Sequence, residues 1–308
     1  MAYRLKPNRS VASEVRRIAT KQLTLAIGEL RAVGTPRRDD AVHEARRHVK
    51  KVRALLRLVQ PALGSVYSAS NRRLRRASRL LAPIADGESM VETFARLEGR
   101  TDGLPRRTGG RVHAALIERQ SRVDRKAALD RALQKTAAIL RGEQRRLAEC
   151  DLNTKGFGAV RHGLEHSVRR LRTAAQRSAA APTAHQYHAW RRRVKDVWLQ
   201  LRLLEGCCGS ALAGDVRRLE ALDECLGEHH NVVILEAILT SDAVVSRRET
   251  AMCLRLLRRY RSALRARAAA LAQTLPVQRP RPFVRRVKRL WHARQARLGA
   301  RRRWQRAA

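Results

Sequence analysis

The order of apolar and polar residues predicts helix along almost the whole chain. Alanine, leucine, arginine and glutamate dominate, and all four favour helix. Segments in which apolar and polar residues alternate strictly, as they do in a strand, are absent from the sequence. Short breaks containing Gly and Pro separate the predicted helices, which span roughly 8–33, 39–60, 66–82, 84–98, 112–149, 157–180, 184–205, 211–227, 231–241 and 244–273. The sequence therefore predicts an all-α fold, with its most loop-like stretch at 99–110.

Two of these helices divide into an apolar face and a basic face. In the helix at 39–60, one face carries polar residues at offsets 0, 3, 7, 10 and 14: His43, Arg46, Lys50, Arg53 and Arg57. At about 100° per residue they fall within an arc of about 80°. The same offsets in the helix at 184–205 hold His188, Arg191, Lys195, Trp198 and Arg202. Coiled coils fill this spacing with leucine, whereas here it is filled mostly with cations.

An internal repeat relates the two basic faces. When the sequence is shifted by 145 residues, 41–86 aligns with 186–231 without a gap, and 15 of the 46 positions are identical. The repeat predicts two related helical bundles, at about 8–149 and 153–275, with a pseudo-twofold relation between them. Like faces would then meet, and the two basic stripes would line one cationic groove or channel.

Charge indicates what that channel would bind. The 308 residues include 67 Lys and Arg against 27 Asp and Glu, a formal net charge of +40, and all but nine of the cations are arginine. Aligned cations with few acidic residues four positions away repel one another unless an anion lies along them. Arginine forks and lysine ammonium groups suit repeated phosphate oxygens. The expected partner is therefore a polyanion.

The two basic helices resemble a known family. HEARRHVKKVRALLRL (43–58) and HAWRRRVKDVWLQLRLL (188–204) are similar to the two signature helices of the CHAD domain, the conserved histidine α-helical domain. RHGLEHSVRRLRTA (161–174) resembles the arginine-rich helix that precedes the second signature. The resemblance implies one CHAD domain over residues 1–278, with two four-helix bundles around a basic central channel. It also implies binding of inorganic polyphosphate and association with polyphosphate granules.

The resemblance also suggests which residues face the ligand. The motif carries over to His43, Arg46, Lys50, Lys51 and Arg53 in the first copy, and to His188, Arg191 and Lys195 in the second. Stripe geometry adds Arg57 and Arg202, and position in the arginine-rich helix adds Arg161, Arg169 and Arg172. The second copy departs from the pattern where Trp198 replaces a cation, which predicts a weaker stripe there.

Catalytic and metal-binding readings have less support in the sequence. It contains no ExExK motif of a CYTH-type triphosphatase, no GxxxxGK[ST] phosphate loop and no GxGxxG. Asp86 with Glu88 is a weak candidate for holding magnesium, and Cys225 with His229, or His185 with His188, for zinc. No four-ligand zinc spacing accompanies either pair. We therefore expect a binding protein without enzymatic activity, metal or other cofactor.

The runner-up function is nonspecific binding of nucleic acid. Residues 279–308 form a basic C-terminal helix or tail, with 12 Arg and Lys and no acid between Arg279 and Arg306. Such a segment could hold a DNA or RNA backbone, although 4% aromatic content argues against base stacking.

Several features of the sequence predict a cytoplasmic protein. MAYRLKPNRS at the start is unlike a secretory signal. No apolar run approaches the ~18 residues of a membrane span, and the odd number of cysteines, five, lacks a CxxC pair. The expected location is the cytoplasm, on polyphosphate granules. The sequence leaves the oligomeric state open.

Overall fold

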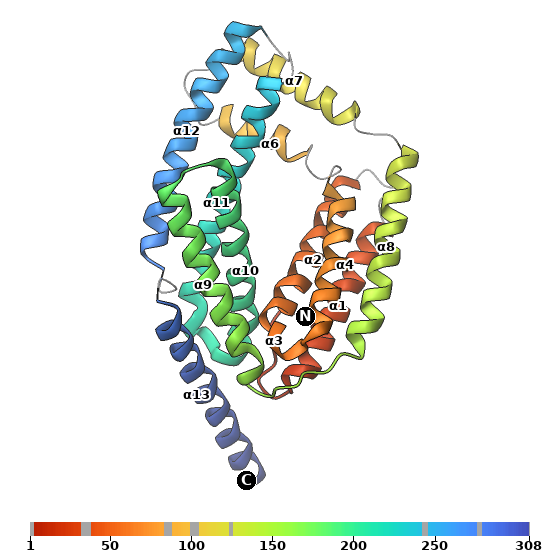
Figure 1. The fold of residues 1–308 in the computed structure, drawn as a ribbon, viewed down its shortest axis with the longest axis vertical. Helices are drawn as coiled ribbons and strands as arrows, with labels where there is room; N and C mark the ends of the chain where they lie inside the picture. Colours follow the sequence, from red (N-terminus) through yellow and green to blue (C-terminus); the bar gives the residue numbers. More distant parts are fainter. Residues whose placement is uncertain are drawn as a thin grey trace.

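The computed structural model describes residues 3–31, 38–82, 88–98, 105–122, 126–241, 246–275 and 279–307. Regular secondary structure in these ranges is helical throughout, so the all-α prediction is confirmed. The helices form two groups that stand side by side, as Figure 1 shows.

The first group is built by helices from the first half of the chain. These are α1 (Val11–Arg31), α2 (Arg38–Leu58), the one-turn α3 (Gln60–Leu63), α4 (Ser65–Leu80) and α8 (Lys126–Ala148). Helix α1 packs against α2 and α8, and α4 packs against the same two helices from the other side. This closed ring encloses fully buried side chains, among them Val15, Leu23, Leu56, Leu74 and Leu140.

The second group follows the same order of elements. It contains α9 (Gly158–Ala180), α10 (Ala184–Cys208), the 3-10 turn η2 (Gly209–Leu212), α11 (Ala213–Ser241) and α12 (Arg247–Gln273). Helix α10 packs between α9 and α11, and α11 packs on α12. Thus α1, α2, α3 and α4 correspond in order to α9, α10, η2 and α11, with the repeated segment beginning in α2 and in α10. The twofold relation itself stays a prediction.

Three helix boundaries differ from the sequence prediction. Helix α7 (Arg106–Arg122) begins inside the expected loop at 99–110, directly after Pro105, a residue suited to the start of a helix. The single helix expected at 112–149 is α7 followed by α8. The two helices expected at 211–227 and 231–241 are one, α11, because Gly227 continues the helix and lies close to the Arg191 side chain.

Helix α6 (Glu88–Glu98) lies against the second group at the upper end of the molecule. It packs on α11 of the second group and on α7, although it belongs to the first half of the chain (Figure 1). Its Met90 and Phe94 side chains are buried.

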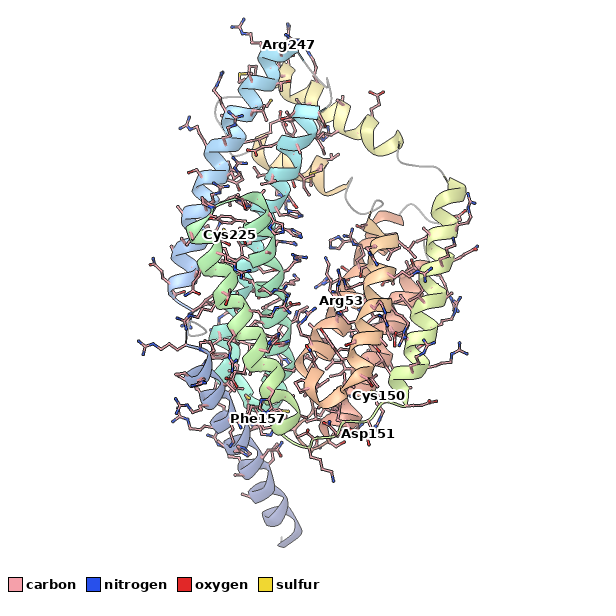
Figure 2. All side chains as sticks on the ribbon, in the orientation of Figure 1. Arg53, Cys150, Asp151, Phe157, Cys225 and Arg247 are labelled. Carbon is pink, nitrogen blue, oxygen red and sulfur yellow. The ribbon has the colours of Figure 1, made fainter. Side chains whose placement is uncertain are left out.

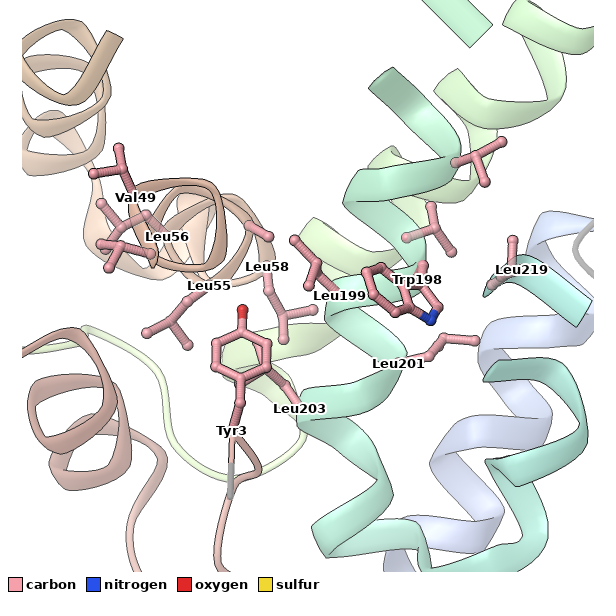
Figure 3. Close-up of a cluster of buried hydrophobic side chains, with 14 of the residues drawn as sticks. Tyr3, Val49, Leu55, Leu56, Leu58, Trp198, Leu199, Leu201, Leu203 and Leu219 are labelled. Carbon is pink, nitrogen blue, oxygen red and sulfur yellow. The ribbon is translucent and has the colours of Figure 1, made fainter. Parts of the chain in front are cut away.

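The two groups also meet through apolar side chains at their lower end. Helix α2 packs on α9 and α10. Figure 3 shows Leu55 and Leu58 of α2 opposite Leu199 and Leu203 of α10, with Tyr3 beside them. All five side chains are buried. The halves are therefore joined at one end by a dry contact, which fixes how α2 and α10 stand to each other further up.

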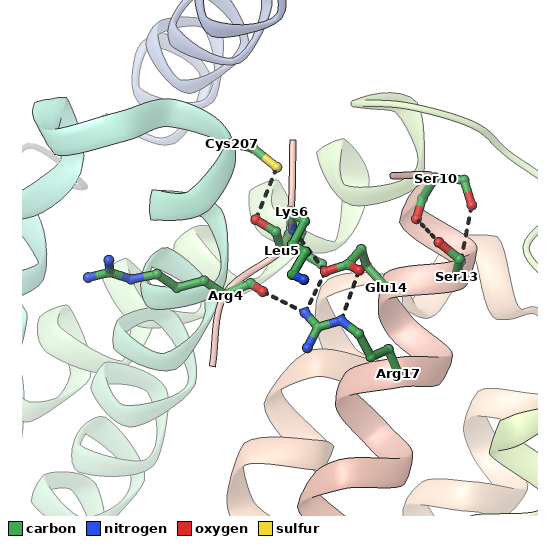
Figure 4. Close-up of polar contacts among 8 residues, drawn as sticks. All are labelled: Arg4, Leu5, Lys6, Ser10, Ser13, Glu14, Arg17 and Cys207. Carbon is green, nitrogen blue, oxygen red and sulfur yellow. Dashed lines mark hydrogen bonds and ion pairs between the residues drawn. The ribbon is translucent and has the colours of Figure 1, made fainter. Parts of the chain in front are cut away.

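The N-terminal segment ties this contact together (Figure 4). The Leu5 amide donates to the Leu203 carbonyl of α10 over 2.9 Å, and Arg4 forms an ion pair with Glu205 at 2.9 Å. On the other side, the Lys6 amide donates to Glu14 of α1 over 2.8 Å. Residues 3–6 thus connect α1 to α10.

The C-terminal basic segment is a helix, α13 (Pro280–Ala307), and not a free tail. It packs on α9, α10 and η2. The residues Phe283, Val284, Val287 and Trp291 of α13 are buried, and Arg286 forms an ion pair with Asp215 of α11. The first three turns of α13 therefore belong to the core of the second group. Among the described residues, no helix has the length and apolar character needed to cross a membrane.

Candidate functional site

Helices α2 and α10 face each other across a cleft of about 550 Å³. Eight of the thirteen residues predicted to bind a ligand line it, five from the α2 stripe and three from the α10 stripe: His43, Arg46, Lys50, Arg53 and Arg57, and His188, Arg191 and Lys195. Figure 2 labels Arg53 on the side of α2 that faces the second group. Residues 145 positions apart in the sequence therefore meet at one surface.

The amphipathic pattern explains why these side chains point into the cleft. On α2, Val49, Val52 and Leu56 are fully buried in the first group. On α10, the equivalent Val194, Val197 and Leu201 are fully buried in the second group. Once each apolar face is buried in its own group, the basic face opposite must point away from that core.

The cleft is strongly cationic. Its described lining contains ten Lys and Arg side chains, three His and a single acid, Asp196. Sequence reasoning missed several of these lining residues, which come from α4, α9, α10 and α11: Arg75, Arg170, Arg192, Arg193, His230 and Asn231. Of these, only Arg192 and Arg193 lie beside a stripe in sequence, and the others are brought in by tertiary packing.

Cations in the cleft are crowded. Burial, together with the charges of Arg46, Arg191 and Lys195, lowers the pKa of Lys50 to about 8. Burial and the charge of Arg57 lower the pKa of Arg53 to about 10. A lowered pKa in a basic group means that its charged form is destabilised by its surroundings. An anion that enters the cleft would relieve this repulsion.

The histidines at the cleft are neutral at pH 7. Burial and the neighbouring His230 and Arg192 lower the pKa of His188 to about 4. The two imidazole rings lie 4.3 Å apart between centroids, and burial with the charges of Arg191 and Lys50 holds the pKa of His230 at about 4. The buried Nδ1 of His188 has no hydrogen-bond partner in the structure. Neutral imidazoles can still donate one hydrogen bond to a phosphate oxygen.

Two carboxylates pair with cations of the cleft. Asp196 forms ion pairs with Arg57 and Arg193, and Asp223 accepts a hydrogen bond from Lys195 Nζ over 2.6 Å. Neither carboxylate comes from the first half of the chain.

Trp198, which interrupts the second stripe, is buried beneath two cations. Lys195 Nζ lies 4.3 Å and Arg202 Cζ lies 5.1 Å from its ring centre. Trp198 is only 7% exposed. Its ring holds both cations by cation–π contact, at the position where the first copy of the repeat has Arg53. The departure from the family pattern is explained by packing.

Five predicted residues do not line the cleft. Lys51 and Arg202 are half-buried beside it, and Arg161, Arg169 and Arg172 are exposed on another face of α9. Helix α9 does contribute to the cleft, but through Arg170. One residue changes the direction of a helical side chain by about 100°, so the arginine-rich pattern alone did not show which arginine of α9 faces the cleft.

The candidate metal-binding residues have other contacts. Cys225 Sγ lies 3.4 Å from the Leu264 carbonyl, and Arg265 donates from Nε to His229 Nε2 over 3.3 Å. Within the described part of the chain, no cluster of three or more His, Cys, Asp and Glu side chains is arranged to hold a metal ion. Asp86 lies outside the described residues.

Comparison with known proteins identifies the fold. The sequence profile of the CHAD domain matches residues 17–240, a span that includes both signature helices and the cleft-lining part of α11. The chain belongs to the CHAD family. A search of curated proteins gave no match.

Two solved structures resemble this CHAD protein over most of their length. PptA from Streptomyces chartreusis is 19% identical, with a TM-score of 0.58 over 86% of this chain and 98% of its own. The CHAD domain from the plant Ricinus communis is 17% identical, with a TM-score of 0.58 over 92% of this chain and 95% of its own. At these identities the likeness shows the shared fold.

Proposed function

We propose that this CHAD protein binds inorganic polyphosphate in the cleft between α2 and α10. The observation that carries the proposal is the convergence of repeated basic stripes from both halves on one cleft whose described lining has ten cations and one acid. Polyphosphate is a chain of phosphates with regularly spaced negative charge. Arginine and lysine side chains on facing helices suit such a ligand, because each phosphate can accept hydrogen bonds from both walls.

The shape of the cleft favours a bare phosphate chain over nucleic acid. A cleft of about 550 Å³ accommodates a single slender chain, whereas a double helix, whose major groove alone is about 12 Å wide, is too thick to enter. Single-stranded nucleic acid is usually held by stacking of bases on aromatic rings. The described lining offers only one aromatic ring besides its histidines, that of Tyr67.

We propose binding without turnover. Phosphoryl transfer normally uses carboxylates that hold magnesium beside the phosphate. The one acid in the described lining is Asp196, and its two oxygens already face Arg57 and Arg193. A protein that binds polyphosphate in this way would collect on polyphosphate granules in the cytoplasm, and we propose that location.

A competition assay tests the proposal. Labelled long-chain polyphosphate is titrated with the protein at about 200 mM salt, where weak nonspecific contacts with polyanions are largely lost. Duplex DNA, single-stranded RNA and unlabelled polyphosphate then compete. The variant Arg46→Glu plus Arg191→Glu reverses one cation on each wall of the cleft and should lose binding by at least about a hundredfold, given about 1.5–3 kcal/mol for each charged contact.

The repeat supplies a matched control. Arg72 and Arg217 are also equivalent by the 145-residue shift, are exposed and lie outside the cleft. Arg72→Glu plus Arg217→Glu makes the same change in net charge and should bind nearly as wild type. If both variants lose affinity equally, or if DNA competes as well as polyphosphate, the protein is a general polyanion binder and the proposal is wrong.

A further inference from the structure

The exposed face of α9 carries cations, and the cleft uses only Arg170 among them. Its exposed arginines are Arg161, Arg169, Arg170, Arg172 and Arg177. The only acid on this helix is Glu165, which is paired with Arg169. A surface helix stabilised by salt bridges would carry an acidic residue four positions from most of its cations. This face is therefore basic beyond what the stability of α9 requires.

One edge of this face opens on the cleft. Arg170 lines the cleft together with Arg193 of α10. Below it, Gly163 packs directly on α2, so closely that a Cβ atom there would lie 1.9 Å from the Leu58 carbonyl oxygen. The same edge of α9 thus contacts α2 at the closed end and borders the cleft about two turns further on.

The opposite edge meets α13. The Phe157 ring, just before α9, packs edge-on against Trp291 with centroids 5.8 Å apart. Arg169 lowers the pKa of the Glu165 carboxyl most, and the charges of Arg161 and Arg281 both lower it further. Because Arg281 acts on Glu165, the start of α13 lies close to the second turn of α9. Here α13 adds further exposed cations: Arg281, Arg285, Lys288 and Arg289.

Helical geometry connects the two edges. At about 100° per residue, Arg172 and Arg169 lie about 20° and 80° around the helix from Arg161, and Arg170 lies about 180° from it. The interval between Arg169 and Arg170 is occupied by the exposed imidazoles of His162 and His166. Basic or hydrogen-bonding side chains therefore cross the whole exposed face of α9, from the cleft to α13.

We propose that this face of α9, with the adjoining start of α13, is a second polyphosphate-binding surface that holds the part of a long chain leaving the cleft past Arg170. We call it the outer track, defined by Arg161, Arg169, Arg172 and Arg281. This inference rests on the proposed function. A cleft of about 550 Å³ cannot contain a long polymer, so most of the chain must lie outside, and its first units would emerge beside these cations. Contacts on a tethered chain raise the total affinity through effective concentration.

Chain length separates the two surfaces experimentally. Tripolyphosphate would occupy only the cleft, whereas long-chain polyphosphate would reach the outer track. The variant Arg161→Gln, Arg169→Gln plus Arg172→Gln leaves the cleft lining intact. It should bind tripolyphosphate as wild type and lose about tenfold or more in affinity for the long chain. Its plot of log affinity against log salt for the long chain should be less steep by about two, because each lost phosphate contact removes roughly 0.7–0.9 from the slope.

A triple variant on another helix controls for net charge. Arg248, Arg255 and Arg259 are exposed on α12, and their replacement by Gln removes the same charge without touching α9. If this control loses as much long-chain affinity as the α9 variant, or if neither loses any, the outer track does not exist. A different result would overturn the proposed function: unchanged tripolyphosphate binding by the cleft variant Lys50→Gln plus Arg191→Gln. The outer track would then be excluded as well, because it rests on that function.

Discussion

Lys50 is a cleft residue that lowers the stability of the unliganded protein while serving the proposed binding of an anion. It stands in the middle of the α2 stripe, half-buried, with its pKa lowered to about 8 by burial and by the charges around it. The charged Lys50 lowers the stability of the folded state by its full amount below the folded-state pKa of about 8. This loss of stability disappears as pH rises toward 10.5, the ordinary pKa of lysine. At neutral pH the ammonium group therefore costs the unliganded protein stability.

Lys50→Met should stabilise the free protein and weaken ligand binding. One pKa unit corresponds to about 1.4 kcal/mol, and with allowance for solvent at the cleft mouth the gain at pH 7 is on the order of 1–2 kcal/mol. Thermal unfolding measures this gain, and its repetition with polyphosphate should show a smaller ligand-induced rise than in wild type. Lys155→Met, at an exposed position, should change neither quantity. Equal stability of the Lys50 variant and wild type would contradict the strain described here.

Histidine protonation should couple binding to pH. His188 and His230 have pKa values of about 4 in the free protein, and a bound phosphate chain would raise them by opposite charge. The complex then holds more protons than the free protein, so affinity increases as pH falls below the bound-state pKa. Titration calorimetry between about pH 5.5 and 8.5, around the usual histidine pKa, should find proton uptake at the acid end.

His43→Gln plus His188→Gln identifies the source of that coupling. The double variant should bind at the alkaline end within a few-fold of wild type and show a much weaker dependence on pH. Flat wild-type affinity across the range would rule out histidine as the coupled group, and an equal slope in the double variant would exclude His43 and His188 as its source.

At the scale of single helices, sequence periodicity predicted the direction of α2 and α10 but not of α9. The first two alternate sharply between valine or leucine and cations, so burial of one face fixes the other. Helix α9 has arginines around half of its circumference, and Arg169 and Arg170 are neighbours that point to different surfaces. Which of them faces the cleft depends on how α9 packs on α2, a tertiary contact that periodicity does not contain.

The packing of α9 on α2 depends on the missing side chain at Gly163. Gly163→Ala would place a methyl group 1.9 Å from the Leu58 carbonyl oxygen, so α9 must move away from α2. We expect a loss of about 1–3 kcal/mol, typical of overpacking a core, and weaker polyphosphate binding because the cleft is built on this contact. Chemical denaturation measures the loss.

Gly28 provides the matched test. It lies within α1, and nothing lies within 4 Å of a Cβ atom there. Gly28→Ala should therefore stabilise the protein by about 0.5–1 kcal/mol through helix propensity alone. A similar gain from Gly163→Ala would mean that α9 and α2 are further apart than described.

The whole molecule is organised around repulsion that its own residues do not balance. The net charge of +40 is spread over a fold whose two groups meet by an apolar contact at one end and face each other with cations above it. The overall excess of arginine was evident from composition. Its concentration on one cleft, with Arg75, Arg170 and His230 added from other helices, required the fold. The composition and the fold both predict that anions stabilise the folded state.

Salt should therefore act in opposite directions on the free and the liganded protein. Added sodium chloride screens the repulsion between the two groups, so the melting temperature of the free protein should rise. Polyphosphate at low salt should raise it further, and sodium chloride should reduce that gain by weakening the complex. The two melting curves plotted against salt should converge. Sucrose, which carries no charge, should stabilise both forms in parallel. A free protein that becomes less stable as salt increases would show that attractive ion pairs, such as Arg286 with Asp215, outweigh the repulsion in the cleft.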